Sequence, residues 1–491
     1  MQNKVQNFQK DLDQISVMLK QQALLASRFD DALICSQLLG RLHFENISDS
    51  FCDDEFEEDI YKKWQTNLVD VWQKLPLSKN KGAWCHIITR TYGFGGHTRL
   101  FIELWKGISA RQIKQSIIIT DKDKGDLREI LLNSESNVDV LSGGLARRCS
   151  DMFEIACGHD VVVLHIHPND IGAALVARKL RLGGTKVLFV NHSDHTFSFG
   201  TGAADAVLEI SATGWKTTQG RRKVLAQHFL GIPLYPNNHT VQNVTRNISG
   251  PILSVGNASK FHPMGDLNFA IFLEKLMKLV PNEVILIGPK TTDPWWKPLL
   301  NKYPSRLLIM GVQHPKIIKM AYQRAACYID SFPMDGGTSF SEAIMSGLPC
   351  FGLNKSSAPG VSPAEALRCY NMNELIEEVV AYLKHGNYSK PIDIVKENIK
   401  KNFSTDVVVE RLYQSSLNNG EPLPKYLHDL GTRGVGYFHT EKTDGFKVSI
   451  PRKIWWKLSF SSRVRMLIGI KAMDLSANSV KLLRRRIIFG L

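Results

Sequence analysis

The sequence predicts an α/β protein with two doubly wound parallel sheets, an N-terminal helical appendage and a basic C-terminal tail. Short β-branched apolar runs alternate with segments of helical spacing from residue 83 onward, and this pattern restarts after a loop that contains Pro233 and Pro236. The chain has 491 residues, of which 43% are hydrophobic, so it is long enough for two or three buried cores. These observations predict four segments, which span residues 1–78, 83–245, 251–418 and 419–491.

The first segment has the spacing of packed helices. Leu12, Ile15, Met18 and Leu19 recur at intervals of three and four residues. Residues 1–78 contain 8 Lys/Arg and 13 Asp/Glu, a net charge of −5, whereas the whole chain has a net charge of +14. We expect a small helical appendage that caps the next domain.

Five apolar runs in the second segment predict the strands of a parallel sheet. They span residues 84–89, 115–120, 138–141, 161–165 and 187–191. Ligands of such sheets bind at the carboxyl ends of the strands. Three unusually polar loops, at residues 91–99, 165–170 and 191–195, follow predicted strands and should lie at that edge.

The third segment repeats the alternation and ends in a stretch with the features of a phosphate site. Strands are predicted at residues 252–255, 284–287, 307–310 and 326–329, and a glycine-rich turn and a helix follow the last of them. Ser339 and Glu342 have capping-box spacing, and Gly347 fits the end of the helix. A helix N-terminus after glycines offers backbone N–H groups to an anion, and Thr338 adds a hydroxyl.

This stretch resembles a segment of a known family. Asp335-Gly336-Gly337-Thr338-Ser339, Glu342 and Gly347-Leu348-Pro349 match, without a gap, the nucleotide-binding segment of the O-GlcNAc transferase family. With its two Rossmann-like halves, the chain as a whole resembles the GT-B glycosyltransferases. The resemblance implies that residues 83–245 form an acceptor domain and residues 251–418 a nucleotide-sugar domain. It implies donor binding by Asn257, Lys260, Asp335, Gly336, Gly337, Thr338, Ser339 and Glu342, with Lys260 paired to the donor diphosphate.

The spacing of carboxylates favours an inverting enzyme. Retaining GT-B enzymes have two glutamates eight positions apart, and the residue eight positions before Glu342 is Met334. An inverting enzyme needs one general base that deprotonates an acceptor hydroxyl. We predict His192 for this role because it directly follows a strand, and we keep Asp194 and His97 as alternatives.

The glycine-rich loop before His97 opens a helix directly after a strand. We expect Gly95 and Gly96 to let the backbone approach the transferring sugar and phosphate, and Arg99 to pair with charge on the donor or the acceptor. The loop lacks the last glycine of a dinucleotide fingerprint, which disfavours an NAD enzyme.

No metal and no cofactor are expected. The eight cysteines include no CxxC pair, the His192/His195 spacing has no third ligand, and Asp121-Lys122-Asp123 is interpreted as a solvated loop. Lys260, Thr338, Ser339 and the helix N-terminus would neutralise the diphosphate of a donor that the resemblance suggests is UDP-linked.

These features together predict a glycosyltransferase that moves a hexosyl or N-acetylhexosaminyl group from a nucleotide-sugar to an acceptor hydroxyl, in the synthesis of a surface polysaccharide or another glycoconjugate. The acceptor would be a glycan, a lipid-linked molecule or a protein. A protein O-glycosyltransferase, a retaining GT-B enzyme, a nucleotide-sugar epimerase and a non-catalytic sugar-binding protein remain as alternatives.

Apolar runs and the composition of the C-terminal tail predict where in the cell the protein lies. The chain lacks an apolar run of ~20 residues and a secretory N-terminus, which indicates a cytoplasmic protein. Residues 451–491 contain 10 Lys/Arg beside Asp474 alone, a net charge of +9, and these alternate with apolar residues such as Trp455, Trp456 and Phe460. This composition is typical of a helix that lies on the anionic inner face of a membrane, and also of a tail that packs on the catalytic domains. No nucleic-acid motif is present, so no nucleic-acid partner is expected.

Overall fold

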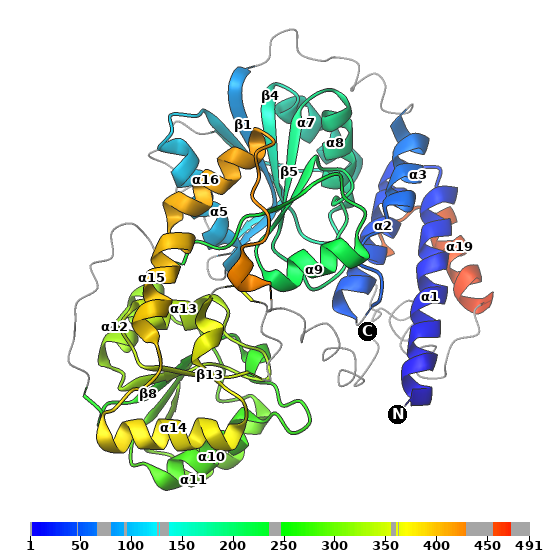
Figure 1. Ribbon diagram of the computed structural model, residues 1–491. Coiled ribbons are helices and arrows are strands. Elements are labelled where there is room, and N and C mark those ends of the chain that lie inside the picture. The colour runs from blue at the N-terminus through cyan, green and yellow to red at the C-terminus, as the bar shows by residue number, and fades with distance from the viewer. Residues whose placement is uncertain are drawn as a thin grey trace.

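The computed structural model (Figure 1) describes residues 2–46, 48–65, 80–92, 96–124, 127, 137–234, 247–354, 360–361, 363–428 and 455–472. Two parallel sheets, each covered by helices, lie one beyond the other, and a layer of N-terminal helices flanks the first (Figure 1). The predicted α/β architecture with a helical appendage is confirmed.

The first sheet has seven parallel strands in the order β3-β2-β1-β4-β5-β6-β7. They are β1 (Asn80–Tyr92), β2 (Gln115–Lys124), β3 (Asn137–Val140), β4 (His159–His165), β5 (Lys186–Asn191), β6 (Ala206–Glu209) and β7 (Gln227–Phe229). The five predicted runs correspond to β1 to β5. β6 and β7, of four and three residues, were not predicted from the sequence.

The second sheet has six strands in the order β10-β9-β8-β11-β12-β13. They are β8 (Ile252–Val255), β9 (Val284–Ile287), β10 (Leu307–Ile309), β11 (Cys327–Ile329), β12 (Cys350–Leu353) and β13 (Arg368–Cys369). The four predicted strands are present, and β12 and β13 add to them.

Both sheets have a topological switch point, where the strand order changes direction. It lies between β1 and β4 in the first sheet and between β8 and β11 in the second. Loops at the carboxyl ends of these strands form the crevice where open α/β sheets bind ligands. The polar loop after β4, residues 96–99 in the connection after β1, and the glycine-containing loops after β8 and β11 therefore occupy the position that a ligand site requires.

Helices connect the strands and cover the sheets. Those of the first sheet are α5 (Gly96–Ser109), α7 (Leu145–Ala156), α8 (Ile171–Leu182) and α9 (Ala212–Arg221). Those of the second are η1 (Ala258–Phe261), α10 (Phe269–Leu279), η2 (Pro294–Trp296), α11 (Lys297–Lys302), α12 (Pro315–Arg324), α13 (Thr338–Met345), η3 (Pro363–Leu367) and α14 (Met372–His385).

Two successive helices return the chain from the second sheet to the first. α15 (Ile392–Phe403) buries Val395 and Ile399 beside the second sheet, whereas α16 (Thr405–Ser416) buries Val408 and Leu412 in the core that contains Leu104 of α5. α16 belongs by sequence to the segment 251–418, yet it packs on the first sheet (Figure 1). η4 (Lys425–Leu427) then follows, with Leu427 buried in the same core as Val395.

The N-terminal helices are α1 (Gln2–Leu25), α2 (Phe29–Glu45) and α3 (Asp54–Gln65). Their buried residues share one core with α7 and α8, so they cap the first sheet as predicted. A helix of the tail, α19 (Phe460–Ala472), lies against α1 (Figure 1). Trp455, Leu458 and Met466 belong to this shared core, so part of the tail packs on the protein, which is one of the two alternatives that its composition left open.

All eight cysteines are free thiols, and all but Cys52 are buried. Within the described part of the chain, no helix has the length and apolar character of a membrane span.

Candidate active site

Two loops of the second sheet meet at its switch point. η1 follows β8 and positions Lys260, whose Nζ donates a hydrogen bond to the backbone oxygen of Asp335 at 2.7 Å. The backbone N–H of Met334 donates to the carbonyl of Lys260 at 3.3 Å. A lysine ammonium has three donors, so this contact leaves Lys260 able to bind an anion. The two stretches that the resemblance assigned to the donor therefore lie together.

A buried ion cluster fixes the loop that leads into α13. Asp330, at the end of β11, accepts a hydrogen bond from the backbone N–H of Gly336 at 2.9 Å. Its other oxygen lies 2.8 Å from Nη2 of Arg368, and the same nitrogen lies 3.1 Å from Asp335. Asp335 is only 6% exposed, so its carboxylate positions the loop through Arg368. Sequence analysis did not single out Arg368, because β13 is two residues long and far away along the chain.

The glycines of this loop are required by its geometry. A Cβ atom on Gly336 would lie 2.2 Å from Oδ1 of Asp330 and 2.4 Å from Oγ of Ser339. Gly337 has φ of +55°, a left-handed conformation that favours glycine, and it immediately precedes α13. Gly347, with φ of +76°, follows the end of the helix as predicted.

The predicted capping box at the start of α13 is wrong. The N-cap position is Gly337, and no side chain caps the helix. Oγ of Ser339 instead lies 3.1 Å from the backbone oxygens of Val255 and Gly336, which can share its proton. The first turn therefore keeps backbone N–H groups without a side-chain cap, the arrangement that favours an anion. Thr338 opens the helix half-buried, and Asn257 lies exposed before η1.

Glu342 contacts the other sheet. Its carboxylate is paired with the guanidinium of Arg99, on the first turns of α5. Glu342 is 22% exposed and Arg99 is 49% exposed, so the pair is open to water and to a ligand. This contact brings together a residue of the predicted donor site and one of the predicted donor/acceptor loop. Gly96 is the first residue of α5, and Gly95 lies outside the described residues.

Two of the three predicted base candidates are neighbours. His97 is the second residue of α5, and His192 directly follows β5 as predicted. Their ring centroids are 4.1 Å apart. Nε2 of His97 lies 3.1 Å from the carbonyl oxygen of His165, which fixes the imidazole with its proton on Nε2 and its lone pair on Nδ1.

Both imidazoles are neutral at physiological pH. Burial lowers the pKa of His97 to about 4, and burial followed by the nearby His97 lowers the pKa of His192 well below its ordinary value. The Nδ1 atoms of both rings are buried without a hydrogen-bond partner. An imidazole nitrogen without a partner that carries the lone pair has the acceptor capacity that a general base requires.

Asp194, the third candidate, lies in a different environment. It is 6% exposed, accepts a hydrogen bond from the hydroxyl of Ser211, and lies 3.3 Å from Nδ1 of His195. Arg222 donates to the backbone oxygens of Asp194 and Thr196, at 3.1 and 2.7 Å. Asp194 therefore anchors the loop that follows His192, and the structure does not bring it to the His97 ring.

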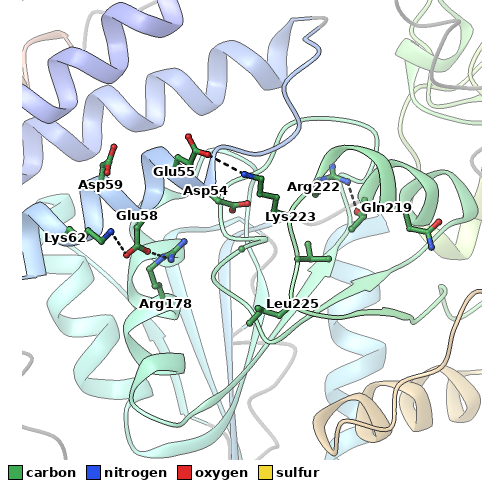
Figure 2. A pocket seen from close by; sticks show the side chains of 13 residues that line it. Asp54, Glu55, Glu58, Asp59, Lys62, Arg178, Gln219, Arg222, Lys223 and Leu225 are labelled. Atoms are coloured by element: carbon green, nitrogen blue, oxygen red, sulfur yellow. Dashed lines mark hydrogen bonds and ion pairs between the residues drawn. The ribbon is translucent and has the colours of Figure 1, made fainter.

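Arg222 also borders an open groove of about 920 Å³ between the helical appendage and the first sheet (Figure 2). α3 contributes acidic residues, among them Glu55 and Glu58, and these are paired with Lys223 and Arg178 from the other wall (Figure 2). Because Glu55 and Glu58 are already paired across it, we interpret the groove as a polar contact between the appendage and the first sheet. It lies away from the loops at the two switch points.

Asp121-Lys122-Asp123, predicted to be a solvated loop, is instead the end of β2 and pairs with β1. Asp121 pairs with Arg90, and Asp123 accepts from the backbone N–H of Leu127 at 3.0 Å. In the described residues, the group of possible metal ligands that lies closest together is Cys369, Glu374 and Glu378. Nζ of Lys390 is 2.8 Å from Glu378, and this cation opposes binding of another.

Comparisons place this site in a known fold. No protein-family model matches the sequence, and no curated protein matches it. The lipopolysaccharide outer core galactosyltransferase WaaB superposes with a TM-score of 0.52 at 13% identity, over 68% of this chain and 99% of WaaB. Anabaena HepE in complex with UDP and glucose gives 0.51 at 14% identity, over 67% of this chain and 98% of HepE. An O-GlcNAc transferase from Thermobaculum terrenum gives 0.49 at 13%, over 79% and 76%. The likeness to WaaB and HepE shows that the chain has the GT-B fold, as the motif implied.

Proposed function

We propose that this protein is a glycosyltransferase that moves a sugar from a nucleotide-sugar donor to an acceptor hydroxyl. The observation that supports it most is the contact between Arg99 and Glu342, because it joins the N-termini of α5 and α13 across the two sheets of a GT-B fold. His97 and His192 lie on the α5 side of this contact, and the N-terminus of α13, which has no side-chain cap, lies on the other. That is the order in which an acceptor base, a transferring sugar and a diphosphate must lie.

Each group has one role in the reaction. His192 takes the proton of the acceptor hydroxyl, with His97 as the neighbour that holds its ring. The acceptor oxygen forms a bond to the anomeric carbon as the bond from that carbon to the diphosphate oxygen breaks. The leaving nucleoside diphosphate takes the bonding electrons, and Lys260 and the first turn of α13 stabilise its charge.

An inverting outcome is supported by the surroundings of Asp335. A retaining enzyme needs a second carboxylate near the sugar, and Asp335 is the nearest one before Glu342 in the sequence. Asp335 is buried and paired with Arg368, so its carboxylate is occupied within the loop and is not the second carboxylate beside the sugar. The same donor contacts require no metal, because Lys260 and the helix N-terminus supply positive charge.

The donor we propose is a UDP-hexose or UDP-N-acetylhexosamine, and the pathway is synthesis of a surface polysaccharide or another glycoconjugate. HepE, a structural neighbour, was solved with UDP and glucose, and TarM of S. aureus, another neighbour, with UDP and α-GlcNAc-glycerol. We also propose that the protein acts in the cytoplasm, attached peripherally to the membrane, so that lipid-linked acceptors are within reach.

A panel of UDP-, GDP-, dTDP- and CMP-sugars tests the donor class. The expected result is a rise in melting temperature with one nucleotide class, because a ligand that binds only the folded state stabilises it. The same donors incubated alone separate transfer from epimerisation, since an epimerase changes the sugar without an acceptor. If none of the donors binds, the remaining hypothesis is a non-catalytic protein that has the GT-B fold without glycosyltransferase activity.

Replacement of His192 by Ala tests the base. Turnover should fall by about 10² to 10⁴ with donor affinity unchanged, because a general base acts in the transition state. His195→Ala is a suitable control, because this neighbouring histidine is exposed. Full activity of His192→Ala would transfer the role to His97 or Asp194.

A further inference from the structure

α19 has a buried face that fastens it to the helical appendage. Met466 is fully buried against the core that contains Met18 of α1. The backbone N–H of Ser459 and the hydroxyl of Ser462 donate to the two carboxylate oxygens of Asp31 on α2, at 3.0 and 2.9 Å. Figure 1 shows α19 beside α1, on the side away from the second sheet. The helix is therefore held in place before any partner arrives.

The opposite face of α19 is apolar and exposed. Its large side chains are Phe460 (75% exposed), Val464 (37%), Leu467 (38%) and Ile468 (63%), and Trp456 (60%) is exposed in the turn before the helix. The intervals of four, three and one residues put the four side chains of α19 on one side of the helix. A contiguous apolar stripe of this kind on a folded protein indicates a surface that binds a partner.

The charged side chains of the segment that carries this stripe have one sign. The guanidinium of Arg463 lies 4.6 Å above the ring of Trp456 and 6.0 Å from that of Phe460, so it lies among the apolar side chains. Residues 455–472 include no Asp or Glu, and residues 451–491 have a net charge of +9. The complementary surface is therefore both apolar and negatively charged.

We propose that α19 is a membrane-docking helix, which inserts its exposed stripe among the acyl chains of an anionic membrane and is held there by the helical appendage. Trp and Phe beside Arg and Lys match the chemistry of a lipid interface. A 13-residue helix alone is marginal in water, and its attachment to α1 and α2 removes the cost of forming it on the membrane. The proposal rests on the membrane attachment proposed above, and it assigns the appendage the role of docking platform.

Co-sedimentation with vesicles tests the proposal on the full chain. The vesicles are phosphatidylcholine alone and phosphatidylcholine mixed with phosphatidylglycerol, and the variant is Trp456→Ser/Phe460→Ser. The matched control is Leu308→Ser/Val312→Ser, which removes two exposed apolar side chains (53% and 55%) from the second sheet and the loop that follows it. Wild type and control should pellet with the anionic vesicles, and the α19 variant should bind them roughly tenfold or more weakly.

A charge variant, Lys457→Glu/Arg463→Glu, should lose the preference for anionic vesicles. Equal pelleting of the α19 variant and the wild type would overturn the proposal, as would a wild type that stays in the supernatant. Light scattering identifies the rival occupant: a wild-type dimer that the α19 substitutions convert to a monomer would assign the stripe to a second copy. Donor-induced thermal stabilisation, measured on each variant, should be unchanged, so loss of membrane binding is distinguishable from failure of the glycosyltransferase assignment.

Discussion

At the scale of residues, Glu342 is paired with Arg99, so a donor that binds Glu342 must displace the Arg99 guanidinium. Glu342 is the carboxylate that we expect to accept hydrogen bonds from the donor ribose, and in the structure Arg99 occupies it. Because the pair is partly exposed, it holds the helices together only weakly. A ribose can therefore replace the guanidinium at small cost.

Glu342→Gln should weaken binding of the donor nucleotide by about 1.5 to 3 kcal/mol, which corresponds to roughly tenfold to 150-fold in Kd, because a charge-assisted hydrogen bond is lost. Isothermal titration with the nucleotide measures it. Glu410→Gln is the matched control, since Glu410 is also a surface glutamate paired with an arginine, Arg111. Equal affinities of wild type and Glu342→Gln would remove Glu342 from the donor site.

The acid limb of the pH–rate profile reports on the two histidines. Burial keeps the pKa of His97 at about 4 and lowers that of His192, so both stay neutral as the pH falls from neutral. We expect kcat/KM to stay flat down to about pH 5, whereas an ordinary histidine base would lose half its activity near pH ~6.5.

Stability must be followed in the same titration. A histidine with a depressed folded pKa is protonated first in the unfolded chain, so its contribution to stability is lost as the pH falls from about 6.5 toward 4. His43 and His86, each with a pKa that burial lowers to about 4, add to this effect. Circular dichroism at each pH separates unfolding from loss of the base. A half-maximal rate near pH 6.5 with the fold intact would exclude both buried histidines as the base.

At the scale of elements, the loop from Asp330 to Thr338 illustrates what a sequence can and cannot predict. The strand, the glycines and the helix were predictable, because their signals are local: an apolar run, Gly336-Gly337, then apolar residues at helical spacing. Arg368 was not predictable, because its role depends on sheet order, which places β13 beside β12. Ser339 had the local spacing of a cap, and a tertiary contact with Val255 overrode it.

Gly336→Ala should destabilise this element by about 1 to 3 kcal/mol and abolish donor binding, because the new Cβ would lie 2.2 Å from Asp330 and 2.4 Å from Ser339. Denaturant unfolding and thermal shift measure the two effects. Gly220→Ala, in α9, is the control: its Cβ meets nothing within 4 Å, and alanine there should be neutral or stabilising. A Gly336→Ala protein with normal donor affinity would show that the loop does not need this close approach.

At the scale of the whole molecule, the chain is joined twice over long distances in sequence. α16 leaves the second sheet and packs on α5, and α19 returns to α1, which belongs to the core on the other face of the first sheet. The appendage and the tail were predicted as separate segments at opposite ends, since nothing in either sequence shows that they share a core. These two contacts have different consequences. α16 packs on α5, the helix that carries His97 and Arg99, whereas α19 packs on the helical appendage.

α5 and α16 are in close contact at Gly107 of α5 and Val409 of α16. A Cβ atom on Gly107 would lie 2.2 and 2.9 Å from the two methyl carbons of Val409, so Gly107→Ala forces α16 away from α5. We expect a loss of about 1 to 3 kcal/mol in stability and a lower kcat, because α5 is displaced relative to α13.

Val409→Ala removes both methyl groups, so the double variant Gly107→Ala/Val409→Ala should be less destabilised than the sum of the single variants. Urea unfolding of the four proteins in this cycle measures the coupling. Strict additivity would show that the two helices do not press on each other here, and that α16 does not set the position of α5.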